Sequence, residues 1–208
     1  MEKSHEFKFE CIKCGNCCTD SNTIVNITYS DILRIKKGLT LTFNELIYIL
    51  AFYVFNTELN EENRKKMVIS PVKTQKGFAF VGLFKKKTGE CYFYDIKNKI
   101  CKIYNLRPMF CRTFPFSFKR LNKNEIKNQY GIDIFYSNKG IEYCPGIGKY
   151  SPLIDIEKYM KLGNKALKDI DLNEEIINKY NTLVNENKIK PSVKNFLNFI
   201  LNKIHPTK

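Results

Sequence analysis

The stretch that decides the fold lies near the N-terminus, where residues 11–18 read CIKCGNCC. Its four cysteines leave too little periodic apolar sequence for a regular helix or strand, so a loop is expected. The two-residue spacing of Cys11 and Cys14 lets both thiolates turn toward one metal, and Gly15 permits a sharp bend of the backbone. The stretch therefore predicts a metal-binding loop.

The other cysteines of the chain are also expected to be metal ligands and not disulfides. A chain of 208 residues can bury a core without covalent staples, and its charged first ten residues lack the apolar run of a secretory signal. These features predict a cytoplasmic protein, whose reducing surroundings keep thiols free for metal. The eight predicted metal ligands are Cys11, Cys14, Cys17, Cys18, Cys91, Cys101, Cys111 and Cys144.

A second group of cysteines, Cys91, Cys101 and Cys111, is spaced with nine residues between neighbours. Ten extended steps span about 33 Å, so these thiols can meet only if the chain reverses between them. A hairpin centred on Ile96, around the polar turn 95–99, would place Cys91 opposite Cys101 with Cβ atoms about 5 Å apart. Thiolates at that distance can share a metal or cluster.

Arg107 and Pro108 precede the third cysteine of this group. Proline at the first position of a helix would leave Cys111 in the first turn, where free N–H groups and the helix dipole favour the thiolate. Arg107 and Arg112 can offset the negative charge of a four-thiolate site. The alternative is that both are ordinary surface arginines.

The ligand spacing favours an iron–sulfur cluster, of the 4Fe–4S type, over zinc. Three cysteines at two-residue spacing open the bacterial ferredoxin pattern, whose remote fourth cysteine is followed by proline, as Cys144 is by Pro145. A structural zinc site more often has a second two-residue knuckle, and none follows residue 18. Zinc is the alternative cofactor.

Eight thiolates are enough for two four-ligand sites. Adjacent side chains project in different directions, so Cys17 and Cys18 are expected to face different partners. One site would centre on the first three cysteines, and the Cys91 group would be completed by Cys18 or Cys144. The alternative is a single four-ligand site, with the remaining thiols buried or forming a redox pair.

The rest of the chain predicts an α+β fold, beginning with two helices after the cysteine loop. Thr28 with Asp31 and Thr42 with Glu45 form capping-box patterns, and Gly38 ends the first helix.

The apolar run 46–55 is about half as long as a membrane span, so it predicts a buried helix and no membrane segment. Residues 67–72 and 78–84 predict strands of a small antiparallel sheet. The cysteine-cluster domain is expected to span residues 1–150. Residues 151–208 predict a C-terminal extension of three amphipathic helices that packs on it.

The net charge of +14 arises from 35 Lys plus Arg against 21 Asp plus Glu. Such a charge can favour nucleic acid, anionic lipid or an acidic protein partner. The lysines are scattered, however, and form no basic run with interleaved aromatic residues, so no specific nucleic-acid binding is expected.

Three motifs follow one another along the chain: Cys11-x2-Cys14-Gly15-x-Cys17-Cys18, Cys91-x9-Cys101-x-Ile103-Tyr104-x2-Arg107-Pro108-x2-Cys111-Arg112-x-Phe114-Pro115-Phe116 and Cys144-Pro145-Gly146. This order resembles the YkgJ-like cysteine-cluster family, known as a zinc- or iron-chelating domain. The resemblance covers residues 7–150 and includes all eight cysteines. It implies metal chelation through them.

Related flagellin lysine N-methylases imply a protein-modifying role as an alternative. No Gly-x-Gly-x-x-Gly loop after a strand offers a nucleotide or S-adenosylmethionine site, and residues 146–148 are too short to serve. Three functions therefore stay open: an iron–sulfur or metal protein for electron transfer, sensing or metal handling, a cluster-dependent enzyme that modifies protein lysines, and a zinc-stabilised interaction module. The protein partner or substrate is not identified.

Overall fold

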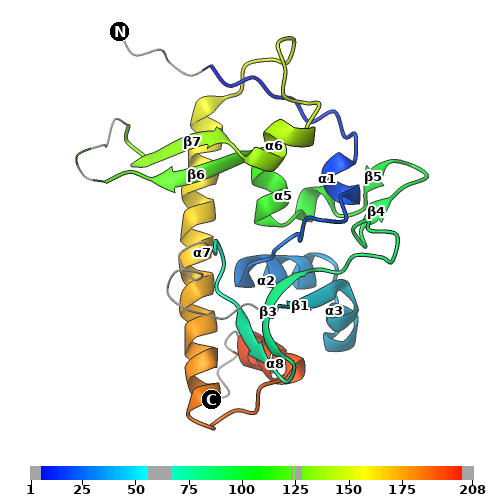
Figure 1. Cartoon of the computed structure of the whole chain (residues 1–208), viewed down its shortest axis with the longest axis vertical. Coiled ribbons are helices and arrows are strands. Elements are labelled where there is room, and N and C mark those ends of the chain that lie inside the picture. Colours follow the sequence, from blue (N-terminus) through cyan, green and yellow to red (C-terminus); the bar gives the residue numbers. More distant parts are fainter. Residues whose placement is uncertain (1–5, 56–66, 123, 125–127, 203–208) are drawn as a thin grey trace.

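The computed structural model describes residues 6–55, 67–122, 124 and 128–202. Its longest element is the helix α7 (Ile156–Asn185), which runs along much of the long axis of the molecule (Figure 1). The other helices and strands pack along this helix or on one another. This arrangement makes α7 the scaffold that connects the two ends of the molecule.

The two helices after the cysteine loop form as the sequence predicts. Both α2 (Tyr29–Gly38) and α3 (Phe43–Ile49) begin with a complete capping box, built on Asp31 and Glu45 respectively. The boxes satisfy N–H groups that have no partner inside a helix, so a local pattern is enough to set both starts. One helical turn, α1 (Asn16–Thr19), forms within the cysteine loop, where no regular element was expected.

The helix expected over 46–55 is only half correct. The helix α3 ends at Ile49, and the strand β1 (Leu50–Val54) continues the same apolar run. This strand pairs antiparallel with β3 (Gly77–Leu83), which satisfies its backbone N–H and C=O groups. The partner lies far along the chain, so the local pattern does not reveal the change from helix to strand.

The strand β2 (Val72–Thr74) pairs with the other edge of β3 and completes a sheet of order β1-β3-β2. It begins at Val72, so the strand expected over 67–72 is misplaced toward the N-terminus. Residues 78–84, in contrast, overlap β3 almost completely.

Two further antiparallel pairs follow the sheet. The strands β4 (Tyr94–Asp95) and β5 (Ile100–Cys101) form a short hairpin, while β6 (Phe116–Arg120) pairs with β7 (Ile132–Tyr136). The short helices near them are η1 (Tyr104–Leu106), α5 (Met109–Thr113) and α6 (Asn138–Tyr143). Short antiparallel sheets with separate helices confirm the α+β class.

Residues 151–202, the part of the C-terminal extension that the structure describes, hold two helices where three were expected. The apolar stripes at 156–170 and 176–184 belong to the single helix α7, and α8 (Val193–Asn202) follows. Asn173, between the stripes, is buried, and its Oδ1 accepts a hydrogen bond from the backbone N–H of Tyr29 at 2.8 Å. The gap in the apolar pattern is therefore a polar contact with the start of α2 and not a helix end.

Two hydrophobic clusters share α7. The larger one contains Ile176, Ile177 and Tyr180 of this helix, and the smaller one contains Met160. α7 contacts α2, α5 and β2 as well as β6 and β7, so one helix packs against both clusters.

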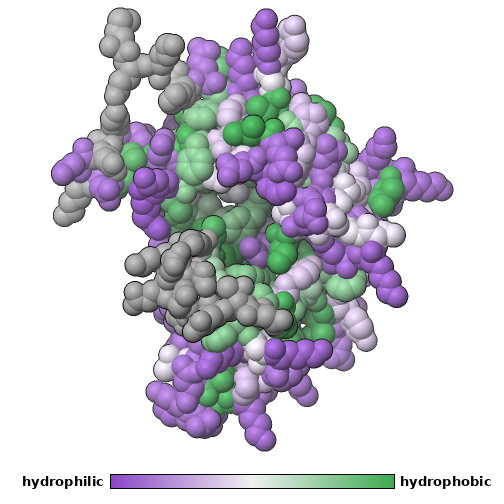
Figure 2. Space-filling view, viewed as in Figure 1, coloured by the Kyte–Doolittle hydropathy of each residue, from purple (hydrophilic) through white to green (hydrophobic). Residues whose placement is uncertain are grey.

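The visible face of the molecule is largely hydrophilic, with apolar side chains between the polar ones (Figure 2). Within the part of the chain that the structure describes, no helix is long and apolar enough to cross a membrane.

The glycine at 163 allows α7 to pack closely on β6. A Cβ at Gly163 would overlap the ring of Phe118. Alanine in a helix normally gains about 1 kcal/mol over glycine, yet forcing an aromatic ring out of its packed position costs about 1–3 kcal/mol. We therefore expect Gly163→Ala to lower the free energy of unfolding, measured by urea denaturation. Lys165→Ala, at an exposed position of the same helix, should change it by less than about 0.5 kcal/mol.

Candidate metal centre

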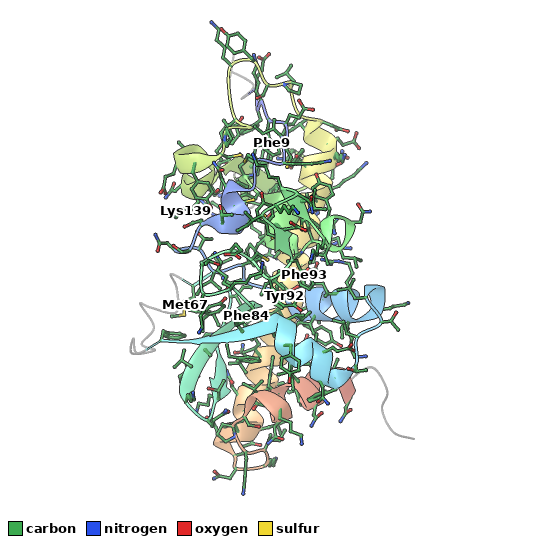
Figure 3. All side chains as sticks on the ribbon, turned by 90° about the vertical axis from the view of Figure 1, so that its right-hand side faces the viewer. Phe9, Met67, Phe84, Tyr92, Phe93 and Lys139 are labelled. Atoms are coloured by element: carbon green, nitrogen blue, oxygen red, sulfur yellow. The ribbon has the colours of Figure 1, made fainter. Side chains whose placement is uncertain are left out.

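All eight predicted ligands line one cavity of about 340 Å³. They reach it from the N-terminal loop, from the segment before β4, from β5, from α5 and from the end of α6. Phe9 and Phe93 also line the cavity, and Figure 3 shows Phe9 nearer the upper end of the molecule than Phe93. Since Phe9 packs in the smaller hydrophobic cluster and Phe93 in the larger, the cavity adjoins both.

Hydrogen bonds join the cysteine loop to the residues on both sides of Cys144. The N–H of Glu10 donates to the carbonyl of Gly146 at 3.1 Å, and the Asn16 side-chain amide donates to the carbonyl of Tyr143 at 3.0 Å. The electrostatic neighbours that act on the Cys144 thiol include Cys14 and Cys17.

A separate contact joins the end of the loop to the second cysteine group. The N–H of Cys91 donates to the carbonyl of Cys18 at 2.7 Å. Charge on the Cys18 thiol would interact with Cys91 and Cys111. The Cys17 thiol acts on the same group as well as on Cys144, so both adjacent thiols lie near the second group.

The hairpin register differs from the expected one. Tyr94, and not Cys91, lies opposite Cys101, and Asp95 lies opposite Ile100. The cause is the turn itself, in which a carboxylate oxygen of Asp95 accepts from the N–H of Asn98 at 3.1 Å and moves the centre of the reversal past Ile96. Cys91 still lines the cavity, and it forms an isolated antiparallel bridge with Lys85 just before the turn that leads into β4.

The two arginines are placed differently. Arg107 lines the cavity, its guanidinium lies 3.7 Å from the centre of the Tyr104 ring, and its Nε donates to the Tyr104 carbonyl at 3.0 Å. Its positive charge favours the thiolate forms of Cys101 and Cys111. Arg112 lies outside the lining residues.

Burial dominates the acidity of most of these thiols. It raises the pKa of Cys91, Cys101, Cys111 and Cys144 above the usual range. The expected stabilisation of a Cys111 thiolate at the start of α5 is therefore wrong as the leading effect, because desolvation penalises the charged form more strongly. Pro108 also takes the N-cap position of α5 and not the first helical position.

The adjacent thiols of Cys17 and Cys18 behave as a pair. Their sulfur atoms are 3.9 Å apart and share one hydrogen bond. This bond lowers the pKa of Cys17 to about 7 and raises the pKa of Cys18. One sulfur thus holds the proton that the other gives up.

The donor set fits a soft metal. Thiolates suit zinc and iron–sulfur clusters, and Glu10 is the only carboxylate among the cavity's lining residues. Over the described ranges, no three Cys, His, Asp or Glu side chains are drawn together tightly enough to hold one ion.

Tyr94 is a site residue that the sequence analysis missed. It is buried, and a Cβ at Gly15 would overlap its hydroxyl, so the phenol packs directly on the cysteine loop. Gly15 has φ +86°, in the left-handed region that favours glycine. The glycine within the cysteine motif was the signal for a close contact at this place, but it did not identify the partner.

An α+β chain whose cysteines surround one cavity has the features of a metal-chelating cysteine domain. Residues 10–132 match the CxxCxxCC family, described as a "Putative zinc- or iron-chelating domain", and the chain belongs to this family. The matched residues contain seven of the eight cysteines, and Cys144 lies beyond them.

Among proteins similar to the chain is the uncharacterized protein MJ0661 of Methanocaldococcus jannaschii. The two are 30% identical over 168 residues, which cover 80% of this chain and 72% of the relative. No solved structure matches the chain.

The contact between Gly15 and Tyr94 predicts an effect of a single methyl group. We expect Gly15→Ala to weaken metal retention against a chelator about tenfold, because the loop must move away from Tyr94. Gly131→Ala is the matched control, since Gly131 also has a positive φ but no atom within 4 Å of its Cβ position. Metal retention in Gly15→Ala equal to that in Gly131→Ala would contradict a role for the contact with Tyr94.

Proposed function

We propose that the chain is an iron–sulfur protein that binds its metal through two sets of four thiolates and uses it for electron transfer, sensing or metal handling. The observation that carries the proposal is the placement of all eight cysteines around one cavity. The first set would contain Cys11, Cys14, Cys17 and Cys144. The second set would contain Cys18, Cys91, Cys101 and Cys111.

The division into sets is supported by the backbone contacts around the loop. The strand-like segment at Phe9 pairs with Ile147, next to the Cys144 turn, and draws Cys11 toward it. The hydrogen bond between the Cys91 N–H and the Cys18 carbonyl draws the other end of the loop toward the second group. The loop thus has one cysteine-bearing neighbour at each end.

An iron–sulfur centre of the 4Fe–4S type is supported over zinc by the ligand spacing. The two-residue spacing of Cys11, Cys14 and Cys17 with a remote Cys-Pro is the bacterial ferredoxin pattern.

The chain's own residues would tune such a centre. Arg107 places a positive charge beside thiolates that carry a net negative charge when they bind metal. Buried Phe93 and Ile103 line the cavity and exclude water from the second set, which lowers the local dielectric. Bound iron and sulfide would supply the electron-accepting chemistry.

The two sets differ in exposure. Cys11 and Cys14 are exposed, whereas Cys91 is buried. Electrons or metal would therefore be exchanged at the first set, because the rate of either exchange falls as the centre lies deeper below the surface.

The metal content tests this function directly. Protein purified without oxygen should be coloured and contain iron together with acid-labile sulfide. Removal of the metal by a chelator should lower the melting temperature by about 5–10 °C, if the bound centre contributes about 2.7 kcal/mol. Colourless protein that contains zinc and no sulfide would contradict the proposal and identify a zinc-stabilised module.

Serine substitutions test the division into sets. Cys144→Ser and Cys91→Ser should each remove one centre, and the double variant should remove both, because sites without shared ligands respond additively. The control is Cys14→Ser combined with Cys144→Ser, which should lose no more iron and sulfide than either single variant. Complete metal loss from a single variant whose circular dichroism is unchanged would contradict two separate sets.

A further inference from the structure

The carboxylate of Asp31 is buried although it carries a formal charge. The residue is 0% exposed, and it lies in the first turn of α2. Its Oδ2 accepts from the N–H of Thr28 at 3.0 Å, which closes the capping box. Its Oδ1 accepts from the N–H of Met109 at 3.0 Å, at the start of α5. One carboxylate thus caps two helices that lie far apart in the sequence.

Arg34, one turn later on α2, binds both this carboxylate and the chain that precedes α5. Its Nη2 donates to Asp31 Oδ1 at 2.6 Å and to the carbonyl of Arg107 at 2.7 Å. The side chain is only 25% exposed, so solvent screens this ion pair less than a surface pair.

These bonds hold the segment that joins two cysteines of the second set. Arg107 and Met109 flank Pro108, which is fully buried, and Cys111 follows within the same short helix. The other end of α2 contacts this segment as well, because a Cβ at Gly38 would overlap the Leu106 side chain. α2 therefore supports the chain from η1 to the start of α5.

The five residues of α5 are too few to set their own position. Isolated helices shorter than about 12–15 residues are marginal in water, so the placement of Cys111 depends on contacts outside α5. The hydrogen bonds to Asp31 and Arg34 are contacts of this kind.

We propose that Asp31 and Arg34 are positioning residues that hold Arg107 and Cys111 against the metal centre. The inference rests on the proposed function, since it assigns the two residues a role at that centre. It goes beyond helix capping, because capping alone requires neither the bond to Met109 nor the bond to Arg107.

The chain contains a matched control for capping. Thr42 and Glu45 form the same box at the start of α3, where Glu45 Oε2 accepts from the Thr42 N–H at 2.8 Å. Both residues are exposed and neither lines the cavity. Glu45→Gln therefore changes a capping carboxylate in the way that Asp31→Asn does, without touching the segment before Cys111.

The experiment measures how fast a chelator removes iron from the metal-loaded, full-length protein. We expect Asp31→Asn and Arg34→Met each to accelerate the loss of visible absorbance about tenfold, the lower end of the effect seen when groups that orient a metal ligand are removed. Glu45→Gln should stay at the wild-type rate. Arg34→Met keeps the Asp31 capping box, so it remains informative if Asp31→Asn does not fold.

Two variants that each lack one metal centre separate the positioning of Cys111 from a general loosening of the fold. In Cys144→Ser, the remaining centre is the second set, and Arg34→Met should accelerate its loss. In Cys111→Ser, the remaining centre is the first set, and Arg34→Met should leave its rate unchanged. Equal acceleration in both backgrounds, or in neither, would overturn the proposal.

A third readout keeps the two proposals distinguishable. If wild-type protein binds no metal, the proposed function fails, and the positioning role is then measured on the metal-free chain as the alkylation rate of Cys111, mapped by mass spectrometry. Arg34→Met should raise that rate about tenfold. An unchanged rate would overturn the positioning role by itself.

Discussion

Sulfur atoms from five separate parts of the chain must reach one cavity, and the rest of the structure follows from this requirement. The elements that carry them are short: α1 has four residues, β5 two and α5 five. Such elements cannot hold a position by themselves, so they depend on α2, on α7 and on backbone bonds between segments. The cavity consequently lies where the two hydrophobic clusters approach each other, with Phe93 on one side and Phe9 on the other.

The features that the sequence predicts correctly depend on residues that lie close together in the chain. The starts of α2 and α3 depend on side chains three residues apart, and Thr28 and Thr42 bond as the capping-box pattern requires. The spacing of the cysteines and the absence of a structural need for disulfides likewise predict metal binding, which agrees with the match to a zinc- or iron-chelating domain. All eight do line one cavity.

What could not be predicted depends on distant partners. Residues 46–55 are apolar throughout, and only pairing with β3 decides that the second half is a strand. The residue that pairs with Cys101 in the β4–β5 hairpin depends on how Asp95 bonds within the turn. The sequence pattern predicts a helix break around Asn173, but α7 continues through this residue. Asn173 is buried because its side chain bonds to the start of α2. In each case a nonlocal or side-chain contact overrode the periodic pattern.

The same architecture explains why metal binding and folding would be coupled on the proposed ligand sets. A metal that joins Cys11 to Cys144 closes a very long loop, and cross-links of long loops remove the most chain entropy from the unfolded state. The two parts of the fold should not respond equally. The sheet β1-β3-β2 and the helices α2 and α3 supply much of the larger hydrophobic cluster. The segment that carries Cys101 and Cys111 consists of short elements, which join this cluster at Ile103 and Phe110 and bond to Asp31 and Arg34. Bound metal and the Asp31–Arg34 ion pair would then both order this segment. Loss of either should therefore loosen this segment before the rest of the fold.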